Sequence, residues 1–467
     1  MYKRTDFITS ALIILLVIFF AWLIAAPEAT PVTMEKRLNR IDQDPAHYLS
    51  PNQPAITLTP DQQAHLLQMF LTLYFSPWDD DARSAASTAA VLLSIQQEQQ
   101  AYSQQPGWQF TGFMFSAEGI QTIIANVDLT NYPAINLPGI VVHVSQVRTF
   151  PTLLPSYGNP QAAGEGYPFD NWIGSYVFPA TPVRILQQSK DRLWYLIKTA
   201  SYYGWVQSSA IGFVSADFIT QWKSHAWVVA VRDDTPVFYD NHRRAVLSLR
   251  KGLIYPALGD QGQQLQILMP FLSANGDAQI QTLLVDKSNV RSFPMPATAE
   301  TIAVLARNFI GQQYGWGGLY ELRDCSATTS DLFANFGFWL PRNSSQQSHF
   351  GRIVSLANMN RNQKLDTIIR EGVPFFTLIH FPGHIAVYLG AHDHQVYILQ
   401  DVWGLRTENF WGREGRAVFG KTIITPIDFG KNFSNIPILQ LDRADSLSIL
   451  SPDFYTPENI NQIDLWK

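Results

Sequence analysis

Residues 313–327 read QYGWGGLYELRDCSA and place the only cysteine of the chain, Cys325, just after a glycine-rich turn. Helical spacing follows, because Thr329, Leu332 and Phe336 lie four, three and four residues apart counting from Cys325. The thiol therefore opens a helix, where unpaired backbone N–H groups favour thiolate over thiol. An isolated free cysteine is more often a small buried residue. A nucleophilic role therefore requires a partner elsewhere in the chain.

That partner is predicted at His384, which opens the apolar stretch GHIAVYLG at residues 383–390. In an extended strand His384 shares one face with Ala386 and Tyr388. A single histidine in such a strand is usually structural. Together with Cys325 it becomes a candidate general base, because a thiol attacking an amide also needs a proton donor for the leaving amine.

The composition indicates a folded protein with several cores. The chain has 467 residues, 46% hydrophobic and 15% charged, with 13 Trp, 18 Tyr and 29 Phe. Its length exceeds what one hydrophobic core usually organises. The net charge of -5 is spread along the chain without a basic block, which argues against a nucleic-acid partner.

The hydrophobic period divides the chain. We expect a helical N-terminal domain over residues 31–145, because apolar residues recur there at three- and four-residue spacings. Short strands with a period of two predict small all-β barrels over 146–223 and 224–295. Mixed helix and strand patterns predict an α+β catalytic domain with a C-terminal extension over 296–467.

The first 30 residues have the pattern of a signal peptide or a membrane anchor. Lys3 and Arg4 precede a run from Phe7 to Ala26 that contains no charge. Its length matches the ~20 residues that a helix needs to span a bilayer. The positive residues place the rest of the chain outside the cytoplasm, in the periplasm or cell envelope. Cleavage and retention as an inner-membrane anchor both remain open.

At this point the sequence resembles the NlpC family of papain-like cell-wall cysteine peptidases. The resemblance rests on YGWGG at 314–318, DCS at 324–326, LPRNS at 340–344 and PGH at 382–384. Upstream, YFSPW at 74–78, RTFPT at 148–152, PFD at 168–170 and GWV at 204–206 resemble the subgroup with a helical N-terminal domain and two bacterial SH3 domains. The resemblance implies a gamma-D-glutamyl-L-diamino acid endopeptidase that acts on peptidoglycan stem peptides without a metal or organic cofactor.

The resemblance also implies roles for individual residues. Cys325 matches the nucleophile and His384 the base. The positions that match substrate contacts, including an acid and a tyrosine of the first SH3 domain that would hold a free amine, are Tyr314, Asp324, Ser326, Ser344, Asp170 and Tyr203.

The chain departs from the family at the third catalytic position. The family usually has a histidine where this chain has Gln400, followed by Asp401. An amide oxygen can accept the imidazole N–H, so Gln400 is the predicted third residue, and Asp401 would serve only if a bulge turned it. The departure leaves two alternatives: an inert peptidoglycan-binding or scaffold protein, and an amidase or acyltransferase that uses the same thiol.

Overall fold

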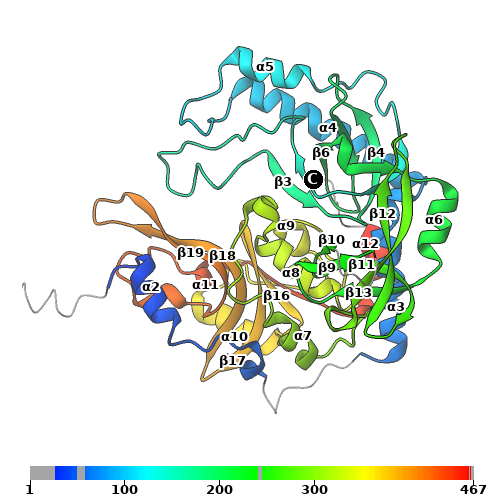
Figure 1. Cartoon of the computed structure of the whole chain (residues 1–467). Coiled ribbons are helices and arrows are strands. Elements are labelled where there is room, and N and C mark those ends of the chain that lie inside the picture. The colour runs from blue at the N-terminus through cyan, green and yellow to red at the C-terminus, as the bar shows by residue number, and fades with distance from the viewer. Residues whose placement is uncertain (1–26, 50–57, 240–244, 462, 464–467) are drawn as a thin grey trace, which may run out of the picture.

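The computed structural model describes residues 27–49, 58–239, 245–461 and 463, which Figure 1 shows in colour. The charge-free run at residues 7–26, predicted as signal or anchor, lies outside this part. Within the described residues, no helix combines the length and the apolar character needed to cross a membrane.

The N-terminal helices are spread over the molecule (Figure 1). In chain order they are α2 (Pro31–Leu38), η1 (Pro45–Tyr48), α3 (Pro60–Tyr74), η2 (Ser76–Trp78), α4 (Ala82–Gln104) and α5 (Ala117–Ala125). α4 and α5 pack together beside the first sheet, whereas α2 contacts β19 (Glu414–Pro426) and α3 contacts η7 (Pro452–Phe454). The predicted helical region is therefore helical, but its first and third helices pack against the end of the chain.

The first all-β unit is a seven-stranded antiparallel sheet of order β3-β2-β6-β5-β4-β1-β7. Its elements are β1 (Leu137–Val141), β2 (Ser145–Arg148), β3 (Ile173–Val177), β4 (Pro182–Gln188), β5 (Trp194–Lys198), β6 (Tyr203–Gln207), η3 (Ser208–Ala210) and β7 (Ile211–Phe213), followed by α6 (Ala216–Lys223). β1 precedes the predicted boundary at residue 146. The sequence pattern does not reveal this strand, because it contains Pro138 and Gly139, and both residue types are rare inside strands.

The second all-β unit is also a seven-stranded antiparallel sheet, of order β10-β9-β13-β12-β11-β8-β14. Its elements are β8 (Ala226–Ala230), β9 (Thr235–Phe238), β10 (Ala245–Leu249), β11 (Ile254–Gln261), β12 (Gln264–Leu272), β13 (Ala278–Asp286), η4 (Lys287–Asn289) and β14 (Val290–Ser292).

The C-terminal unit combines helices with a six-stranded sheet of order β15-β20-β16-β17-β18-β19. Its further elements are α7 (Ala299–Ala306), η5 (Trp316–Glu321), α8 (Cys325–Ala334), α9 (Ser344–Gln347), β15 (Arg352–Ser355), α10 (Arg361–Glu371), β16 (Thr377–Phe381), β17 (His384–His392), β18 (Gln395–Glu408), η6 (Phe429–Asn432), α11 (Gln440–Arg443), β20 (Ser446–Ile449) and α12 (Pro457–Asn461). The mixture of helix and sheet agrees with the predicted α+β class. α8 lies against β17 and β18, which carries the cysteine to the sheet.

Two features fasten the β units to α8. Gly317 in the glycine-rich turn has a φ of 58°, and a Cβ there would lie 2.5 Å from the Ile173 carbonyl oxygen, so the turn fits closely against β3. From the other side, the buried Arg323 donates to both carboxylate oxygens of Asp233, at 2.8 and 2.7 Å, and to Asp331 at 2.7 Å. The residue two before the cysteine is therefore held by an ion-pair cluster that includes the second β unit.

Candidate active site

Cys325 is the first residue of α8, as the sequence predicts. Asp324 caps the helix, because its Oδ1 accepts the backbone N–H of Ala327 at 3.0 Å. Cys325 is 8% exposed. The backbone N–H of Ile385, the residue after His384, hydrogen-bonds the thiol and acts to lower its pKa. The sulfur therefore lies beside the start of β17 (His384–His392), the strand that carries the predicted base.

Strand pairing brings His384 and Gln400 together on one face of the sheet. His384 Nε2 and Gln400 Oε1 are 2.9 Å apart. Gln400 Nε2 donates to Thr425 Oγ1 at 2.8 Å, and Gln440 Nε2 donates to Gln400 Oε1 at 2.7 Å, so the amide is held from both ends. With its oxygen fixed as the acceptor, Gln400 selects the tautomer that carries the proton on Nε2 and leaves Nδ1 to accept one.

Asp401 points to the other side of the strand, under the first turns of α8. Its Oδ2 accepts the Thr328 hydroxyl at 2.9 Å, and its buried Oδ1 has no hydrogen-bond partner. Burial raises the pKa of Asp401 well above its ordinary value. No bulge turns Asp401 toward His384, so it does not take the third position.

The resting thiol and imidazole are both neutral. Burial, and then the neighbouring Asp324 carboxylate, raise the pKa of Cys325 to about 12. Burial lowers the pKa of His384 to about 4, and the hydrogen bond that His384 donates to Gln400 opposes that change. Desolvation and the Asp324 carboxylate therefore act against the thiolate that the helix N-terminus favours.

Tyr314 lies beside this pair. Its backbone N–H donates to the Gly420 carbonyl oxygen at 2.9 Å, and its ring centroid is 6.0 Å from that of Trp403. Burial raises the pKa of the Tyr314 phenol, and Cys325 and Asp324 are its next largest influences. The phenol is thus protonated and close to the thiol, as expected for a group lining the oxyanion region.

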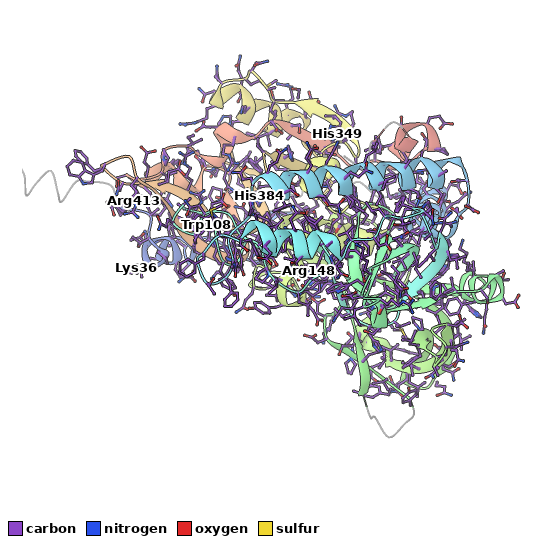
Figure 2. The ribbon with its side chains drawn as sticks, turned by 90° about the horizontal axis from the view of Figure 1, so that it is seen from above. Lys36, Trp108, Arg148, His349, His384 and Arg413 are labelled. Carbon is purple, nitrogen blue, oxygen red and sulfur yellow. The ribbon has the colours of Figure 1, made fainter. Side chains whose placement is uncertain are left out.

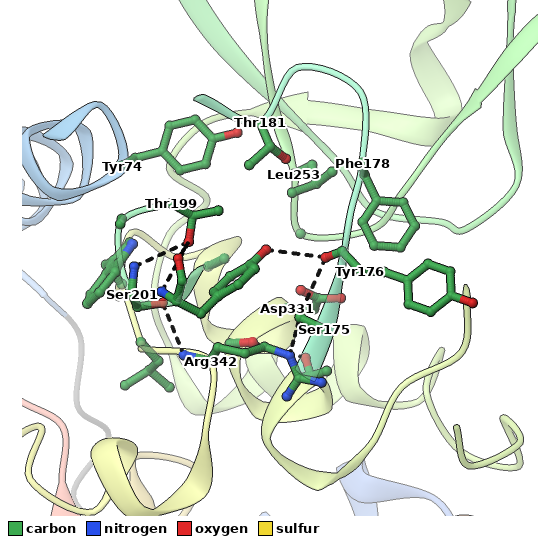
Figure 3. Close-up of a pocket in the computed structure, with 18 of the residues that line it drawn as sticks. Tyr74, Ser175, Tyr176, Phe178, Thr181, Thr199, Ser201, Leu253, Asp331 and Arg342 are labelled. Atoms are coloured by element: carbon green, nitrogen blue, oxygen red, sulfur yellow. Dashed lines mark hydrogen bonds between the residues drawn. The ribbon is translucent and has the colours of Figure 1, made fainter. Parts of the chain in front are cut away.

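Arg342 belongs to the site although the sequence analysis gave it no role. Its guanidinium donates to Asp324 Oδ1 at 3.0 Å and Oδ2 at 2.7 Å, and to the Ser326 hydroxyl at 3.0 Å. Figure 3 shows its link to the first sheet, where its Nε donates to Ser175 Oγ at 2.8 Å and its backbone N–H to Ser201 Oγ at 3.2 Å. Its place in the LPRNS motif was the available signal.

Asp170 does not have the carboxylate freedom that amine binding requires. Its Oδ2 accepts from the buried Arg148 at 3.1 Å, and its Oδ1 accepts the backbone N–H groups of Ser156 and Trp172, each at 2.9 Å. Asp170 itself is 4% exposed. These bonds organise the loop that enters β3, and they engage both carboxylate oxygens, so a role of Asp170 in amine binding stays a prediction.

Tyr203 instead meets an acid of α4. Its hydroxyl donates to Glu98 Oε1 at 3.2 Å, while the buried Glu98 Oε2 has no hydrogen-bond partner. Burial raises the pKa of Glu98 to about 7. Both residues line a pocket of about 360 Å³ that also includes Ser201 and, from the catalytic unit, Asn343. The pocket thus adjoins Arg342, and Glu98 was missed because α4 was interpreted as a structural cap.

Ser344 is the first residue of α9, capped by Asn343, whose Oδ1 accepts the Gln346 N–H at 2.9 Å. A separate cavity of about 150 Å³, drawn in Figure 3, lies on the opposite side of α8 from the thiol, because it is lined by Ala327, Ser330 and Ala334. Arg342 also lines this cavity, so the cavity adjoins the site built around Cys325 from the side away from the thiol.

Comparison with known families matches residues 311–399, which include Cys325 and His384, to the model "NlpC/P60 family". The chain belongs to the NlpC/P60 family. Two further models match this NlpC/P60 protein: the N-terminal stabilising domain of the family at residues 11–132 and an SH3 domain of SH3b1 type at 155–207. The second match falls in the first sheet, and an SH3 assignment of the second sheet stays a prediction.

The NlpC/P60 protein also resembles individual relatives. A solved NlpC/P60 endopeptidase from Photobacterium damselae subsp. piscicida is 28% identical with a TM-score of 0.77, covering 88% of this chain and 98% of that one. A gamma-D-glutamyl-L-lysine dipeptidyl-peptidase of Bacillus subtilis is 27% identical over 31% of this chain and 50% of its own length. A protein of Corynebacterium glutamicum named "Probable endopeptidase" is 29% identical over 20% of this chain and 44% of its own length. The chain thus spans about half of the curated relatives that it matches.

Proposed function

We propose that this NlpC/P60 protein hydrolyses the bond between a gamma-linked D-glutamyl residue and a diamino acid in peptidoglycan stem peptides. The observation that supports this most is the 2.9 Å contact between His384 and Gln400 beside the thiol of Cys325. It supplies a nucleophile, a base and a group that orients the base, which is the arrangement a thiol peptidase requires. The name of the Bacillus subtilis relative supports the choice of bond.

The reaction starts from a neutral pair. His384 Nδ1 takes the proton of the Cys325 thiol as the sulfur attacks the carbonyl carbon, and the resulting oxyanion accepts the backbone N–H of Cys325, one of the unpaired donors at the start of α8. His384 then gives the proton to the departing amine. A water molecule hydrolyses the thioester, with His384 as base, and restores the thiol.

Arg342 and Ser326 supply recognition of the glutamyl carboxylate. The guanidinium has five N–H donors, and the bonds to Asp324, Ser326 and Ser175 use four of them. The remaining donor and the Ser326 hydroxyl can both face a substrate carboxylate. Asp324 keeps the guanidinium in place, because a bidentate pair fixes its plane.

Glu98 and Tyr203 supply recognition of a free N-terminal amine, in place of the predicted Asp170. The unpartnered Glu98 Oε2 needs a donor, and an ammonium group entering the pocket satisfies it and ionises the carboxyl. An acylated amine would leave that oxygen unpaired, which costs about 1–3 kcal/mol. The enzyme should therefore prefer released or trimmed peptides to intact wall.

The test is cleavage of the free tripeptide stem and of its N-acetylated form, followed by mass spectrometry that identifies the broken bond. We expect cleavage after D-glutamate, loss of all cleavage in Cys325→Ala, and a Glu98→Gln variant that loses roughly 5- to 150-fold in kcat/KM on the free peptide only. Glu118→Gln, which changes an exposed acid on α5, is the matched control. Equal use of both peptides by the unaltered protein would reject the amine proposal, and inactivity of the unaltered protein would favour the inert scaffold.

The location of the protein is part of the same proposal. A cell-wall substrate requires export, and the charge-free run at 7–26 provides a signal or an anchor. The amidase or acyltransferase alternative differs only in the acceptor and the bond, so the same mass spectra separate it from hydrolysis.

A further inference from the structure

The hairpin formed by β18 and β19 ends in two aromatic side chains that contact little else of the chain. Phe410 is 93% exposed and Trp411 is 86% exposed. They stand in the turn between Glu408 and Glu414, which is closed by bonds from Asn409 N–H to the Arg413 carbonyl oxygen and from Gly412 N–H to the Asn409 carbonyl oxygen. Two adjacent aromatic rings exposed to water at a hairpin tip are unfavourable in free energy unless another surface covers them.

A basic groove lies at the same end of the molecule. It has a volume of about 540 Å³, and its lining includes Lys36, Arg37 and Arg40 from α2 and the chain after it. Lys36 and Arg40 are exposed, and among the described residues neither forms an ion pair. Figure 2 shows Lys36 and Arg413 toward one end, and Figure 1 shows α2 and the hairpin there. Cations without partners are thus gathered here although the chain carries a net charge of -5.

The chain enters this end directly from its apolar run. Phe7 to Ala26 carry no charge, and Pro27, the next residue, accepts the Ser434 N–H at 3.0 Å through its carbonyl oxygen. Glu35 of α2 pairs with Lys421 of β19 at 3.1 Å, and Lys421 lies seven residues along the strand from Glu414. At about 3.3 Å per residue, Lys421, which pairs with α2 beside the groove, lies roughly 23 Å along the strand from Glu414 at the base of the tip.

We propose that the tip and the groove together form a membrane-contact surface, which rests on an anionic phospholipid bilayer. Tryptophan and phenylalanine enter the headgroup region, and lysine and arginine attract anionic lipid. Two separate contact points fix the tilt of the molecule on a flat surface, which one anchor cannot do. The inference does not depend on the proposed reaction.

A bilayer explains the surface better than a glycan strand does. Aromatic rings also stack on sugars, but a glycan offers no reason for the cations at the groove to cluster where a charge-free run joins the fold. Lipid accounts for the rings, the cations and the run together.

The test uses the full chain in vesicles of phosphatidylcholine, with or without phosphatidylglycerol, whose acyl chains carry bromine that quenches tryptophan fluorescence. A Trp22→Phe background is used, because Trp22 lies within the apolar run. With phosphatidylglycerol we expect quenching that Trp411→Phe removes and that Trp108→Phe leaves in place. Loss of the two positive charges alone is worth roughly 30-fold, so reversing Lys36 and Arg40 to glutamate should lower the docking equilibrium by at least that factor.

A Lys190→Glu, Arg192→Glu variant is the charge control, because it reverses two exposed cations in the turn between β4 and β5 and should not alter quenching. Cleavage of soluble peptide by Trp411→Phe should equal that of the parent. Unquenched Trp411 in anionic vesicles would overturn the proposal. A fluorescence response of Trp411 to purified glycan strands without one to lipid would also overturn it, in favour of wall binding.

Discussion

Replacing Gln400 by alanine removes the oxygen that faces His384 Nε2 at 2.9 Å. Gln400 is 2% exposed, and its other contacts are Thr425 and Gln440, so bulk water does not fill its place freely. The imidazole then keeps a buried N–H without an acceptor, and its ring loses the bond that sets its tautomer and orientation.

The burial of the His384–Gln400 contact determines the expected loss of kcat. A buried donor left unpaired costs about 1–3 kcal/mol. If the whole of this cost disfavours the ring orientation that reacts, kcat falls roughly 5- to 150-fold, at about 1.4 kcal/mol per factor of ten. The KM for the tripeptide should change little, because Gln400 contacts His384 rather than the substrate groups proposed above.

The assay is steady-state cleavage of the free tripeptide followed by chromatography. Gln440→Ala is the control, because it removes a neighbour of Gln400 while leaving the His384 contact intact, and it should lose less than Gln400→Ala. Gln400→Glu keeps the acceptor, adds a negative charge and should raise the pKa of His384. Normal kcat in Gln400→Ala, or an equal loss in Gln440→Ala, would refute the orienting role.

Three further results are expected. First, kcat of the unaltered protein at saturating peptide should fall only as pH drops toward about 4, the lowered pKa of His384, because the imidazole must be neutral to accept the thiol proton; an acid limb of kcat near the ordinary histidine value would contradict this. Second, Asp401→Asn should raise the thermal midpoint at pH 8 far more than at pH 4, because the pKa of Asp401 is raised by folding, so the unaltered protein loses stability as rising pH deprotonates the unfolded chain; thermal scans with equal shifts at both pH values would exclude it. Third, Asp233→Asn should cost about 3 kcal/mol in urea unfolding, since Arg323 stays buried with only Asp331 as counter-ion, whereas Asp234→Asn, at an exposed neighbour, should change little; similar losses in both variants would contradict the role of the cluster.

The spacing of residues along the sequence was sufficient to predict the centre of the site. Cys325 after a glycine turn and His384 at the head of an apolar strand each depend on local periodicity, and both keep the predicted places in α8 and β17. The position of Gln400 against His384 follows from strand alternation, which also sends Asp401 to the opposite side.

The periphery of the site could not be predicted in the same way. Asp170 was chosen from its motif, but Arg148, which donates to its carboxylate, lies in β2, and burial of both residues is a tertiary effect. Glu98 comes from α4, whose polar run of Gln and Glu gives no sign that one carboxyl is enclosed beside Tyr203. The raised pKa of Cys325 likewise depends on how deeply the fold buries the helix end.

The order of strands has a consequence for when the enzyme is completed during synthesis. β20 is the last strand of the described residues in sequence, yet it inserts between β15 and β16 in the catalytic sheet, and α2 packs against β19, which comes much later in the sequence. During synthesis from the N-terminus, the place between β15 and β16 therefore stays empty until residues 446–449 have been made. Such long sequence separations slow folding. The sheet that carries His384 and Gln400 is therefore incomplete until residues 446–449 have joined it.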